Sequence, residues 1–327
     1  MRARHLSSAA RALIPLLLAT ACRGAPPSKT DWGDDDAADS GAAEGPNTAR
    51  IASFNAEWLA DHYTTSATER DDFQPRLEAD YAMIRSLIVD NQIDVLGLQE
   101  VEGDRAIELL GLPSTWSWVV GDTGWSQNLV IAWRNDRFAL DKLRAIPLDA
   151  NSGAARDPLV AELRHRDGEL GFTLVVVHNN PYEDASEARM RKAQVEELAV
   201  WLEATLPDEE SSDLADQHIV LGDFNDSFEG INPSVPSLDA LEGAAGLRFA
   251  SRQTTGVSYI PYASLIDHIA LSPPLAERWP DADDPEGFGI ILHDQTEPWS
   301  SYSEGYRGVP NISDHRPVYV DLRLAAD

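Results

Sequence analysis

Short apolar runs separated by polar turns recur along most of the chain, which is the pattern of buried β-strands. Seven such runs predict strands, at residues 51–54, 93–98, 129–133, 172–177, 219–221, 266–271 and 317–322. Three segments predict helices, at residues 77–88, 106–110 and 191–206. These helices are too few for the strict strand–helix alternation of a TIM barrel. We therefore expect an α/β fold in which two packed, mixed β-sheets are flanked by helices.

Polar side chains stand at or beside one end of six of these predicted strands. A rigid scaffold commonly presents binding and catalytic residues at such positions. Packing alone does not explain six apolar strands that each meet a carboxylate, an amide or an imidazole. The residues concerned are Asn55, Glu57, Gln99, Glu100, His178, Asn179, Asn180, Asp223, Asn225, Asp267, His268, Asp314 and His315.

This set of side chains is what metal-assisted phosphoryl transfer requires. Mg²⁺ prefers a few carboxylate oxygens and retained water, which Glu100 could supply together with Asn55, Glu57 or Asp314. Neutral asparagine side chains can hold phosphate oxygens without adding negative charge. Histidines can stabilise the charge that develops on the phosphate, and a carboxylate can orient or activate the attacking water.

The ordered motifs carry a resemblance to a known family. They read F-N-A-E-W, L-Q-E-V, V-H-N-N-P, R-x-x-Q, G-D-F-N, I-D-H-I and S-D-H-R-P-V, and they extend from Ile51 to Leu322. This set resembles the endonuclease/exonuclease/phosphatase superfamily, whose members include deoxyribonuclease I. The resemblance implies a deoxyribonuclease I-like sandwich of four layers, α/β/β/α, and hydrolysis of a phosphate ester by in-line attack of water. It also implies a divalent cation, Mg²⁺ or else Mn²⁺ or Ca²⁺.

The resemblance further assigns roles to individual residues. The implied metal-site residues are Glu100, as the principal ligand, with Asn55, Glu57 and Asp314. The implied catalytic residues are His178 near the leaving group, Asp223 at the attacking water, Asn225 at the phosphate, and His315 oriented by Asp267. Either Asp223 or the Asp267–His315 pair can be the general base, and the sequence leaves that choice open.

Residues near these motifs are candidates for substrate binding. Asn180, Arg191 and Trp58 are predicted to contact the substrate, and Gln194 completes the R-x-x-Q motif. The segment 279–311 is long, rich in Gly, Pro and aromatic residues, and ends just before Asp314. Loops of such length are commonly functional, so this segment is predicted to select the substrate.

The remaining histidines are interpreted without a catalytic role. His268 follows Asp267 in its strand, so alternation turns it away from the site, and we expect it to face solvent. Surface or loop positions are expected for His62, His165, His218 and His293.

The N-terminal residues predict export. Basic residues and an apolar run over residues 12–21 precede Cys22, and this run is shorter than the ~20 residues of a membrane-spanning helix. Small residues before Cys22 resemble a bacterial lipobox, so residues 1–22 are interpreted as a signal peptide with lipidation at Cys22. An ordinary cleaved signal is the alternative. The protein would then be a bacterial cell-envelope lipoprotein or a secreted protein.

Two further segments follow the signal. Residues 23–49 are predicted to form a disordered acidic linker, because their composition cannot bury enough apolar surface to fold. Residues 50–327 are predicted to form one domain. Since Cys22 is the only cysteine, internal disulfides are excluded.

The charge of the predicted domain narrows the choice of substrate. After Thr48 the chain has 21 Lys and Arg against 49 Asp and Glu. Such a balance disfavours tight binding to long DNA, which relies on basic residues at the phosphates. It does not disfavour chemistry on a phosphate inside a metal-loaded cleft, because bound cations invert the local charge.

A phosphodiesterase or nuclease outside the cytoplasm is the first interpretation. A sphingomyelinase-like phospholipase and a small-molecule, inositol-type phosphatase are alternatives within the same chemistry. A non-catalytic surface binding module that retains the fold is the alternative of another class. The expected partners are a phosphate-ester substrate, with nucleic acid as one candidate, and a membrane reached only through the N-terminal lipid. No protein partner is implied, and a monomer is expected.

Overall fold

The computed structural model describes residues 47–59, 78–121, 127–148, 156–181, 184–204, 214, 216–229, 236–243, 245–279, 288–293 and 312–325. The predicted signal peptide with Cys22, nearly all of the predicted linker, and His62 lie outside these residues. Most of the predicted substrate-selecting segment also lies outside them, at residues 280–287 and 294–311. No helix within the described ranges is long and apolar enough to cross a membrane.

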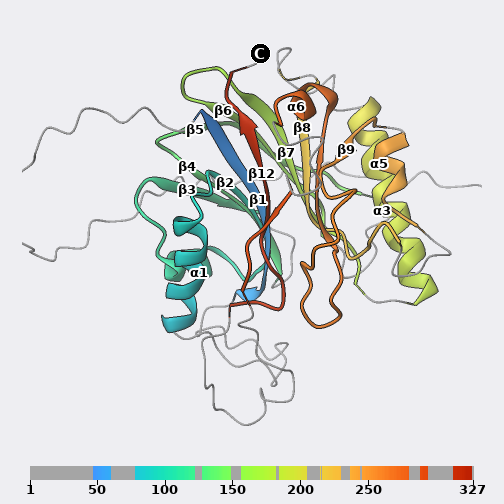
Figure 1. Ribbon diagram of the computed structural model, residues 1–327, viewed down its shortest axis with the longest axis horizontal. Helices are drawn as coiled ribbons and strands as arrows, with labels where there is room; N and C mark the ends of the chain where they lie inside the picture. Colours follow the sequence, from blue (N-terminus) through green and yellow to red (C-terminus); the bar gives the residue numbers. More distant parts are fainter. Residues whose placement is uncertain are drawn as a thin grey trace, which may run out of the picture.

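The described residues form two six-stranded sheets (Figure 1). The first sheet has the order β11 (Gly289–Ile290), β12 (Val318–Arg323), β1 (Thr48–Leu59), β2 (Val95–Val101), β4 (Asn128–Arg134) and β3 (Trp116–Val120). The second has the order β5 (Phe138–Ala145), β6 (Leu159–His165), β7 (Gly171–His178), β8 (His218–Asp223), β10 (Asp267–Leu271) and β9 (Arg248–Phe249). The pairs β1–β2 and β7–β8 are parallel and the other pairs are antiparallel, so both sheets are mixed.

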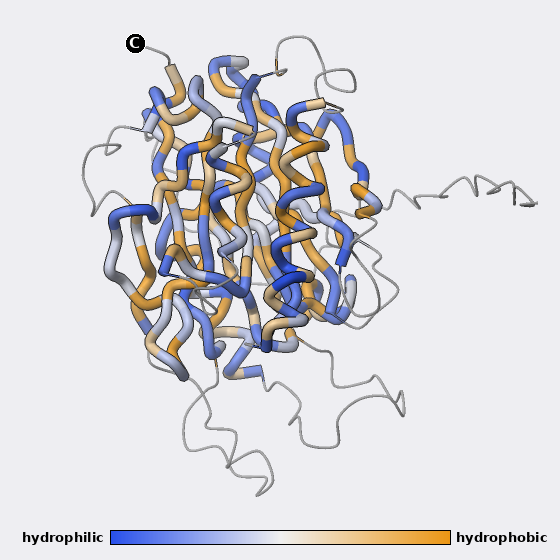
Figure 2. The backbone as a smooth tube through the Cα atoms, turned by 90° about the vertical axis from the view of Figure 1, so that its right-hand side faces the viewer, coloured by the Kyte–Doolittle hydropathy of each residue, from blue (hydrophilic) through white to orange (hydrophobic). Residues whose placement is uncertain are grey.

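Three buried clusters define four layers. One cluster lies between the sheets and includes Val95 and Ile131 of the first sheet and Leu174 and Leu221 of the second. A second cluster joins the outer face of the first sheet to α1 (Glu78–Asp90) and α2 (Asp104–Leu110). The third joins the outer face of the second sheet to α3 (Ala185–Ala204) and α5 (Asp239–Gly243). Figure 1 shows α1 on one side of the strands and α3 and α5 on the other, and Figure 2 shows apolar positions running along the interior strands. The predicted α/β fold of two packed sheets flanked by helices is thereby confirmed.

The seven predicted strands and three predicted helices are all present, but the prediction was incomplete. It missed β3, β5, β6, β9 and β11, and the short helices α5 and α6 (Pro273–Glu277). Four of the five missed strands are sheet edges. Helix α3 also begins at Ala185 rather than at residue 191, because Asp184 Oδ1 caps it by accepting the backbone N–H groups of Ser186 at 2.8 Å and Glu187 at 3.2 Å. Strand β1 begins at Thr48, two residues before the predicted domain start.

Strand register brings the candidate residues to one region. In the second sheet His178 pairs with Asp223, and Asp223 pairs with Asp267, so these three residues form one row across β7, β8 and β10. In the first sheet Asn55 pairs with Gln99, and Glu100 follows. The two rows face each other because β1 contacts both β8 and β10.

Candidate active site

Asn55 joins the two sheets at the centre of the site. Its Nδ2 donates a hydrogen bond to Asp223 Oδ2 at 3.0 Å and lies 3.3 Å from Glu100 Oε1. Asn55 and Asp223 are each only 1% exposed. A single buried amide therefore fixes one carboxylate from each sheet, and the site forms only when the sheets are packed.

Three further contacts organise the acidic side of the site. The backbone N–H of Asp314 donates to Glu57 Oε2 at 3.0 Å, and that of Trp58 donates to Glu100 Oε2 at 3.3 Å. The backbone N–H of Glu57 donates to Asn55 Oδ1 at 3.0 Å. The four residues predicted to hold a metal, which are Asn55, Glu57, Glu100 and Asp314, are thus brought together in one network.

Two histidines complete the site. His178 Nε2 lies 3.6 Å from Glu100 Oε1 and 3.6 Å from Asp223 Oδ2. His315 Nδ1 donates to Asp267 Oδ2 at 2.8 Å, and its Nε2 lies 3.8 Å from Asp223 Oδ2. Asp267 therefore orients the His315 ring so that Nε2 points toward Asp223.

Burial and neighbouring charges separate the protonation states of these groups. Burial raises the pKa of Asp223 to about 7; the charge of His315 opposes this shift and that of Asp267 adds to it. Burial disfavours a charged His315, but Asp267, Asp314 and Asp223 outweigh it and raise the His315 pKa well above the usual value. Burial also lowers the pKa of His178 well below the usual value, and the charges of Arg156 and His315 lower it further. At neutral pH the site thus combines a protonated His315 with a neutral His178.

The backbone is strained at the residues that line the site. Positive φ angles occur at Glu57 (44°), Trp58 (52°), Glu100 (60°) and Asn225 (52°), which are four of the six non-glycine residues with positive φ in the described ranges. Such strain costs about 1–3 kcal/mol per residue and persists where surrounding contacts impose it. It is concentrated here in the segments that carry the polar network.

Asn225 belongs to this network through its backbone and its side chain. Its N–H donates to Asp223 Oδ1 at 2.8 Å, and its Nδ2 donates to the Asn179 carbonyl at 3.0 Å. The first contact fixes the Asp223 carboxylate opposite Asn55, and the second ties the ends of β7 and β8 together.

The donor set fits a hard divalent cation. Glu57, Glu100, Asp314 and Asn55 offer the oxygen ligands that Mg²⁺, Mn²⁺ and Ca²⁺ prefer. Burial raises the pKa of Asp314 well above its usual range, and the charges of Glu57 and Glu100 raise it further although His315 opposes them. A bound cation would relieve this repulsion.

Asp223, Asp267 and His315 form a second compact group. One possible ligand atom from each lies within 4.8 Å of the others. Because the raised pKa of His315 keeps both of its ring nitrogens protonated, neither offers a lone pair to a metal, and we interpret this trio as a proton-handling group rather than as a metal site.

The predicted substrate contacts lie around the site in different settings. Asn180 Nδ2 donates to Glu187 Oε2 at 2.7 Å, and the Asn180 N–H donates to Gln194 Oε1 at 3.1 Å. Arg191 is 1% exposed and donates to the Asn180 carbonyl at 3.2 Å. Asn180 and Arg191 thus hold the loop after His178 against α3, and their contact with substrate stays a prediction. Trp58 is half-buried beside Glu100.

Three residues near the site were missed by sequence reasoning. Arg156 is buried, donates to the Gln127 carbonyl at 3.1 Å, and is close enough to lower the His178 pKa. Ser313 Oγ donates to the Asn55 carbonyl at 2.7 Å and accepts the His315 N–H at 2.9 Å. Because Ser313 stands beside Asp314 in the S-D-H motif, the sequence could have indicated its place at the site. The third residue is Tyr259, whose ring lies against His315. Neither Arg156 nor Tyr259 belongs to a motif that could have indicated its position.

The predicted positions of the non-catalytic histidines were wrong for three of them. His268 is fully buried, because the face of β10 that points away from the site is covered by Phe224, Phe228 and Phe249. His165 and His218 are also buried, in or beside central strands. His293 lies in a loop, as predicted, where it is half-buried and its Nε2 donates to the His315 carbonyl at 2.8 Å.

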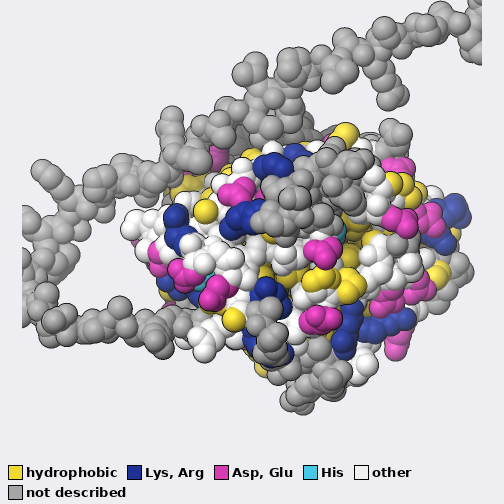
Figure 3. Space-filling view, turned by 90° about the horizontal axis from the view of Figure 1, so that it is seen from above, with side chains coloured by type: hydrophobic (Ala, Val, Ile, Leu, Met, Phe, Trp, Pro, Cys, Tyr) yellow, Lys and Arg dark blue, Asp and Glu magenta, His cyan; other side chains and the backbone are white. Residues whose placement is uncertain are grey.

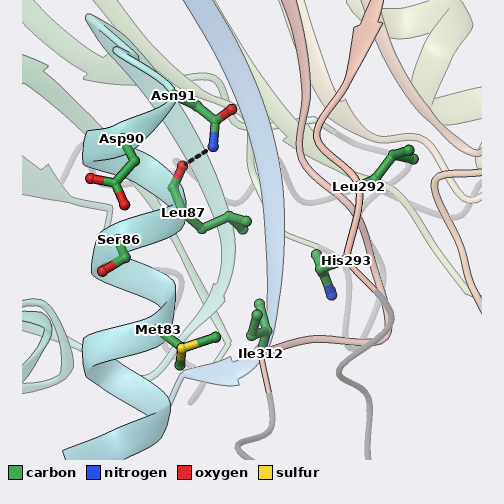
Figure 4. Close-up of a pocket in the computed structure, with 8 residues that line it drawn as sticks. All are labelled: Met83, Ser86, Leu87, Asp90, Asn91, Leu292, His293 and Ile312. Carbon is green, nitrogen blue, oxygen red and sulfur yellow. Dashed lines mark hydrogen bonds between the residues drawn. The ribbon is translucent and has the colours of Figure 1, made fainter.

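A groove of about 330 Å³ lies outside the carboxylate network, between α1 and the residues that precede β12 (Figure 4). It is lined by Met83, Ser86, Leu87, Asp90, Asn91, Leu292, His293 and Ile312. His293 links this groove to the site through its bond to the His315 carbonyl, and Ile312 directly precedes Ser313.

Comparison with known proteins identifies the family. A profile of the endonuclease/exonuclease/phosphatase family matches residues 52–315, so the chain belongs to this family. Members of the family hydrolyse phosphate esters and typically use divalent metals. No curated protein sequence matches the chain.

Solved structures show the same fold at low sequence identity. The human Nocturnin catalytic domain with bound sulfate anion is 16% identical, with a TM-score of 0.54 and coverage of 84% of this chain and 94% of that chain. Caenorhabditis elegans TDP2 is 17% identical, with a TM-score of 0.57 and coverage of 84% and 97%. The Bacteroides thetaiotaomicron mannosyl-6-phosphatase is 17% identical, with a TM-score of 0.53 and coverage of 83% and 98%.

Proposed function

We propose that the protein is a divalent-metal-dependent phosphodiesterase that hydrolyses its substrate by in-line attack of water, with a nuclease as the first candidate. The observation that carries this proposal is the junction of the two sheets. There Asn55 binds Asp223 and Glu100, while His315 is paired with Asp267 and faces Asp223. This arrangement supports the proposal, because carboxylates that would hold a cation lie beside a proton acceptor and a charged imidazole.

Asn55, Glu57, Glu100 and Asp314 would hold the cation, with Mg²⁺ as the first candidate and Mn²⁺ or Ca²⁺ as alternatives. A bound divalent cation supplies Lewis-acid stabilisation of the phosphate and lowers the pKa of bound water.

Asp223 is the proposed acceptor of the proton from the attacking water. Its pKa of about 7 makes it a base matched to neutral pH, and the N–H groups of Asn55 and Asn225 fix both of its oxygens. The Nε2 of protonated His315 lies 3.8 Å from Asp223 Oδ2, and this charge would stabilise negative charge on the phosphate in the transition state.

His178 and Arg156 are proposed to act on the leaving-group side. His178 has a low pKa and is therefore neutral, and its Nδ1 has no hydrogen-bond partner among the described residues. Arg156 places a buried cation beside it, which suits a phosphate oxygen.

The acidic surface favours a compact substrate over a long polyanion. On the described part of the face shown in Figure 3, acidic and basic side chains are interspersed. A small-molecule phosphatase is therefore the second candidate function, and the similarity to a mannosyl-6-phosphatase supports it. A sphingomyelinase-like phospholipase is a further alternative, and a non-catalytic binding module is the alternative of another class.

A hydrolysis panel on the full-length protein separates these candidates. It compares plasmid DNA, RNA, sphingomyelin, inositol and sugar phosphates, and bis-p-nitrophenyl phosphate, each with Mg²⁺, Mn²⁺, Ca²⁺ or chelator. We expect metal-dependent turnover of one diester class and its loss in His315→Ala. Turnover restricted to monoesters would replace the diesterase proposal with the phosphatase, and silence across the panel would support the binding module.

Export and lipidation at Cys22 are proposed from the sequence pattern of residues 1–22. In a bacterial host, the wild-type protein should fractionate with membranes and Cys22→Ser should be released. Equal membrane retention of both proteins would contradict lipidation.

A further inference from the structure

A short hairpin directly before β10 lies against the catalytic histidine. It runs from Ser258 to Ser264, and we call it the Ser258 hairpin. The Tyr259 N–H donates to the Ser264 carbonyl at 2.9 Å, and the Ser264 N–H donates to the Tyr259 carbonyl at 3.2 Å. Ala263 in its turn has a φ of 50°, so the turn is tight and its geometry is imposed.

The backbone of this hairpin holds the segment around His315 from both sides. The Ile260 N–H donates to the Asp314 carbonyl at 2.8 Å, and the Arg316 N–H donates to the Ser258 carbonyl at 2.7 Å. Tyr259 thereby forms a β-bridge with His315. Two backbone hydrogen bonds therefore join the hairpin to the segment that carries His315.

The same hairpin also holds the partner of His315. Ser258 Oγ accepts the Asp267 N–H at 3.1 Å, and it accepts the Ile266 N–H at 3.1 Å. Both members of the Asp267–His315 pair are therefore tied to Ser258 and Tyr259, which are adjacent in sequence.

The Tyr259 ring lies against the His315 ring. Their centroids are 4.8 Å apart and their planes are tilted by 41°. Tyr262 lies against Tyr259 in turn, at 5.6 Å and 40°, and is 73% exposed. An aromatic ring beside an imidazole restricts its rotation, and the negative face of the ring favours a nearby positive charge.

The contact between the Tyr259 and His315 rings lies outside the hydrophobic core. Tyr259 is only half-buried, and it belongs to none of the three buried clusters formed by described residues. A substitution that keeps the backbone of the hairpin should therefore spare the fold and change the position of the His315 ring.

We propose that Tyr259 is a positioning residue, whose ring holds His315 in the orientation in which Nδ1 binds Asp267 and Nε2 faces Asp223. The ring, rather than the phenolic hydroxyl, performs this role. The consequence for turnover rests on the proposed function, whereas the consequence for the His315 ring does not.

The kinetic test compares Tyr259→Leu, which removes the aromatic ring, with Tyr259→Phe, which keeps it. Small displacements of a catalytic group cost up to about 10²-fold in rate. We expect Tyr259→Leu to lower kcat by about 10- to 100-fold with KM within about threefold, and Tyr259→Phe to restore kcat to within about threefold of wild type. Tyr319→Leu is the control, because Tyr319 in β12 is also half-buried, but its ring packs on Arg50 of β1, away from the site.

Two kinetic outcomes would overturn the proposal. A near-normal kcat in Tyr259→Leu would show that the ring does not position His315. Equal losses in Tyr259→Leu and Tyr259→Phe would show that the hydroxyl acts instead of the ring.

A spectroscopic test is independent of activity. In protein with ¹⁵N-labelled histidine, the Nδ1–H that His315 donates to Asp267 should give a downfield proton signal, assigned by its loss in His315→Gln. We expect this signal in wild type and in Tyr259→Phe, and its loss or displacement in Tyr259→Leu. An unchanged signal in Tyr259→Leu would overturn the positioning role, whereas an inactive wild type with the expected signals would refute only the proposed function.

Discussion

The burial of His268 in the second sheet allows a prediction of how the stability of the protein depends on pH. It is fully buried in β10 among Phe224, Phe228 and Phe249, and burial lowers its pKa to about 4. Its Nε2 must carry a proton, because its partner is the Asp226 carbonyl at 2.9 Å. In the neutral ring Nδ1 then accepts the Ser251 hydroxyl hydrogen at 2.7 Å. The folded protein therefore stabilises the neutral ring.

The sign and size of the effect follow from linkage. The unfolded chain binds a proton at His268 near pH 6.5, whereas the folded chain does so only near pH 4. Stability is therefore fully present above pH 6.5 and is lost as the pH falls toward 4. A shift of this size removes about 2 kcal/mol between pH 7 and pH 5.

The assay is urea unfolding followed by tryptophan fluorescence at several pH values between 5 and 7.5, with chelator present throughout. His268→Gln is the comparison, because a neutral amide cannot titrate while the remaining ionisable groups are unchanged. We expect the free energy of unfolding of wild type to fall about 2 kcal/mol more than that of His268→Gln between pH 7 and pH 5. Parallel pH dependence of the two proteins would refute the buried neutral histidine.

Three substitutions test contacts around the site. In Gly97→Ala the added methyl would meet Leu221 and Val176 between the sheets. We expect the free energy of unfolding in urea to fall by about 1–3 kcal/mol. An unchanged urea midpoint would show that the neighbouring side chains move to accept the methyl. Ser313→Ala removes the bonds to the Asn55 carbonyl and the His315 N–H, and should lower the free energy of unfolding by about 1–3 kcal/mol and lower kcat. Unchanged unfolding and kcat would show that these two bonds do not hold the site. Arg191→Met loosens the loop after His178 and should lower kcat about tenfold with little change in KM. A higher KM with unchanged kcat would instead support the predicted substrate contact.

The central strands could be predicted from sequence because both of their faces are buried. β2, β7 and β8 lie inside their sheets and read as continuous apolar runs. The edge strand β5 could not be predicted in this way, because much of it is half-buried or exposed and it carries Asp141, Lys142 and Arg144. An edge strand pairs with a neighbour on one side only and often carries charged residues, so its own sequence lacks the apolar run that predicts a strand.

The site could be predicted as a set of residues but not as a geometry. Parallel strands bring their carboxyl ends to one edge, which accounts for His178 and Asp223. The bond from Asn55 to Asp223 depends on how two sheets pack and has no signal in either strand. For His268, the alternation of side chains along a strand predicted correctly that the ring points away from the site. It could not show that α3, α5 and β9 cover that face of the sheet and bury the ring.

The most direct test of the account is turnover of a phosphodiester by full-length wild type and Asp223→Asn, before and after chelation and re-addition of Mg²⁺. Asp321→Asn is the matched control, because Asp321 is a carboxylate bound to Arg50 outside the site. We expect chelation to abolish wild-type turnover and Mg²⁺ to restore it, with Asp223→Asn reduced by at least about 10²-fold and Asp321→Asn unaffected. Turnover that is indifferent to chelator, or near-normal in Asp223→Asn, would contradict metal-dependent hydrolysis at this site.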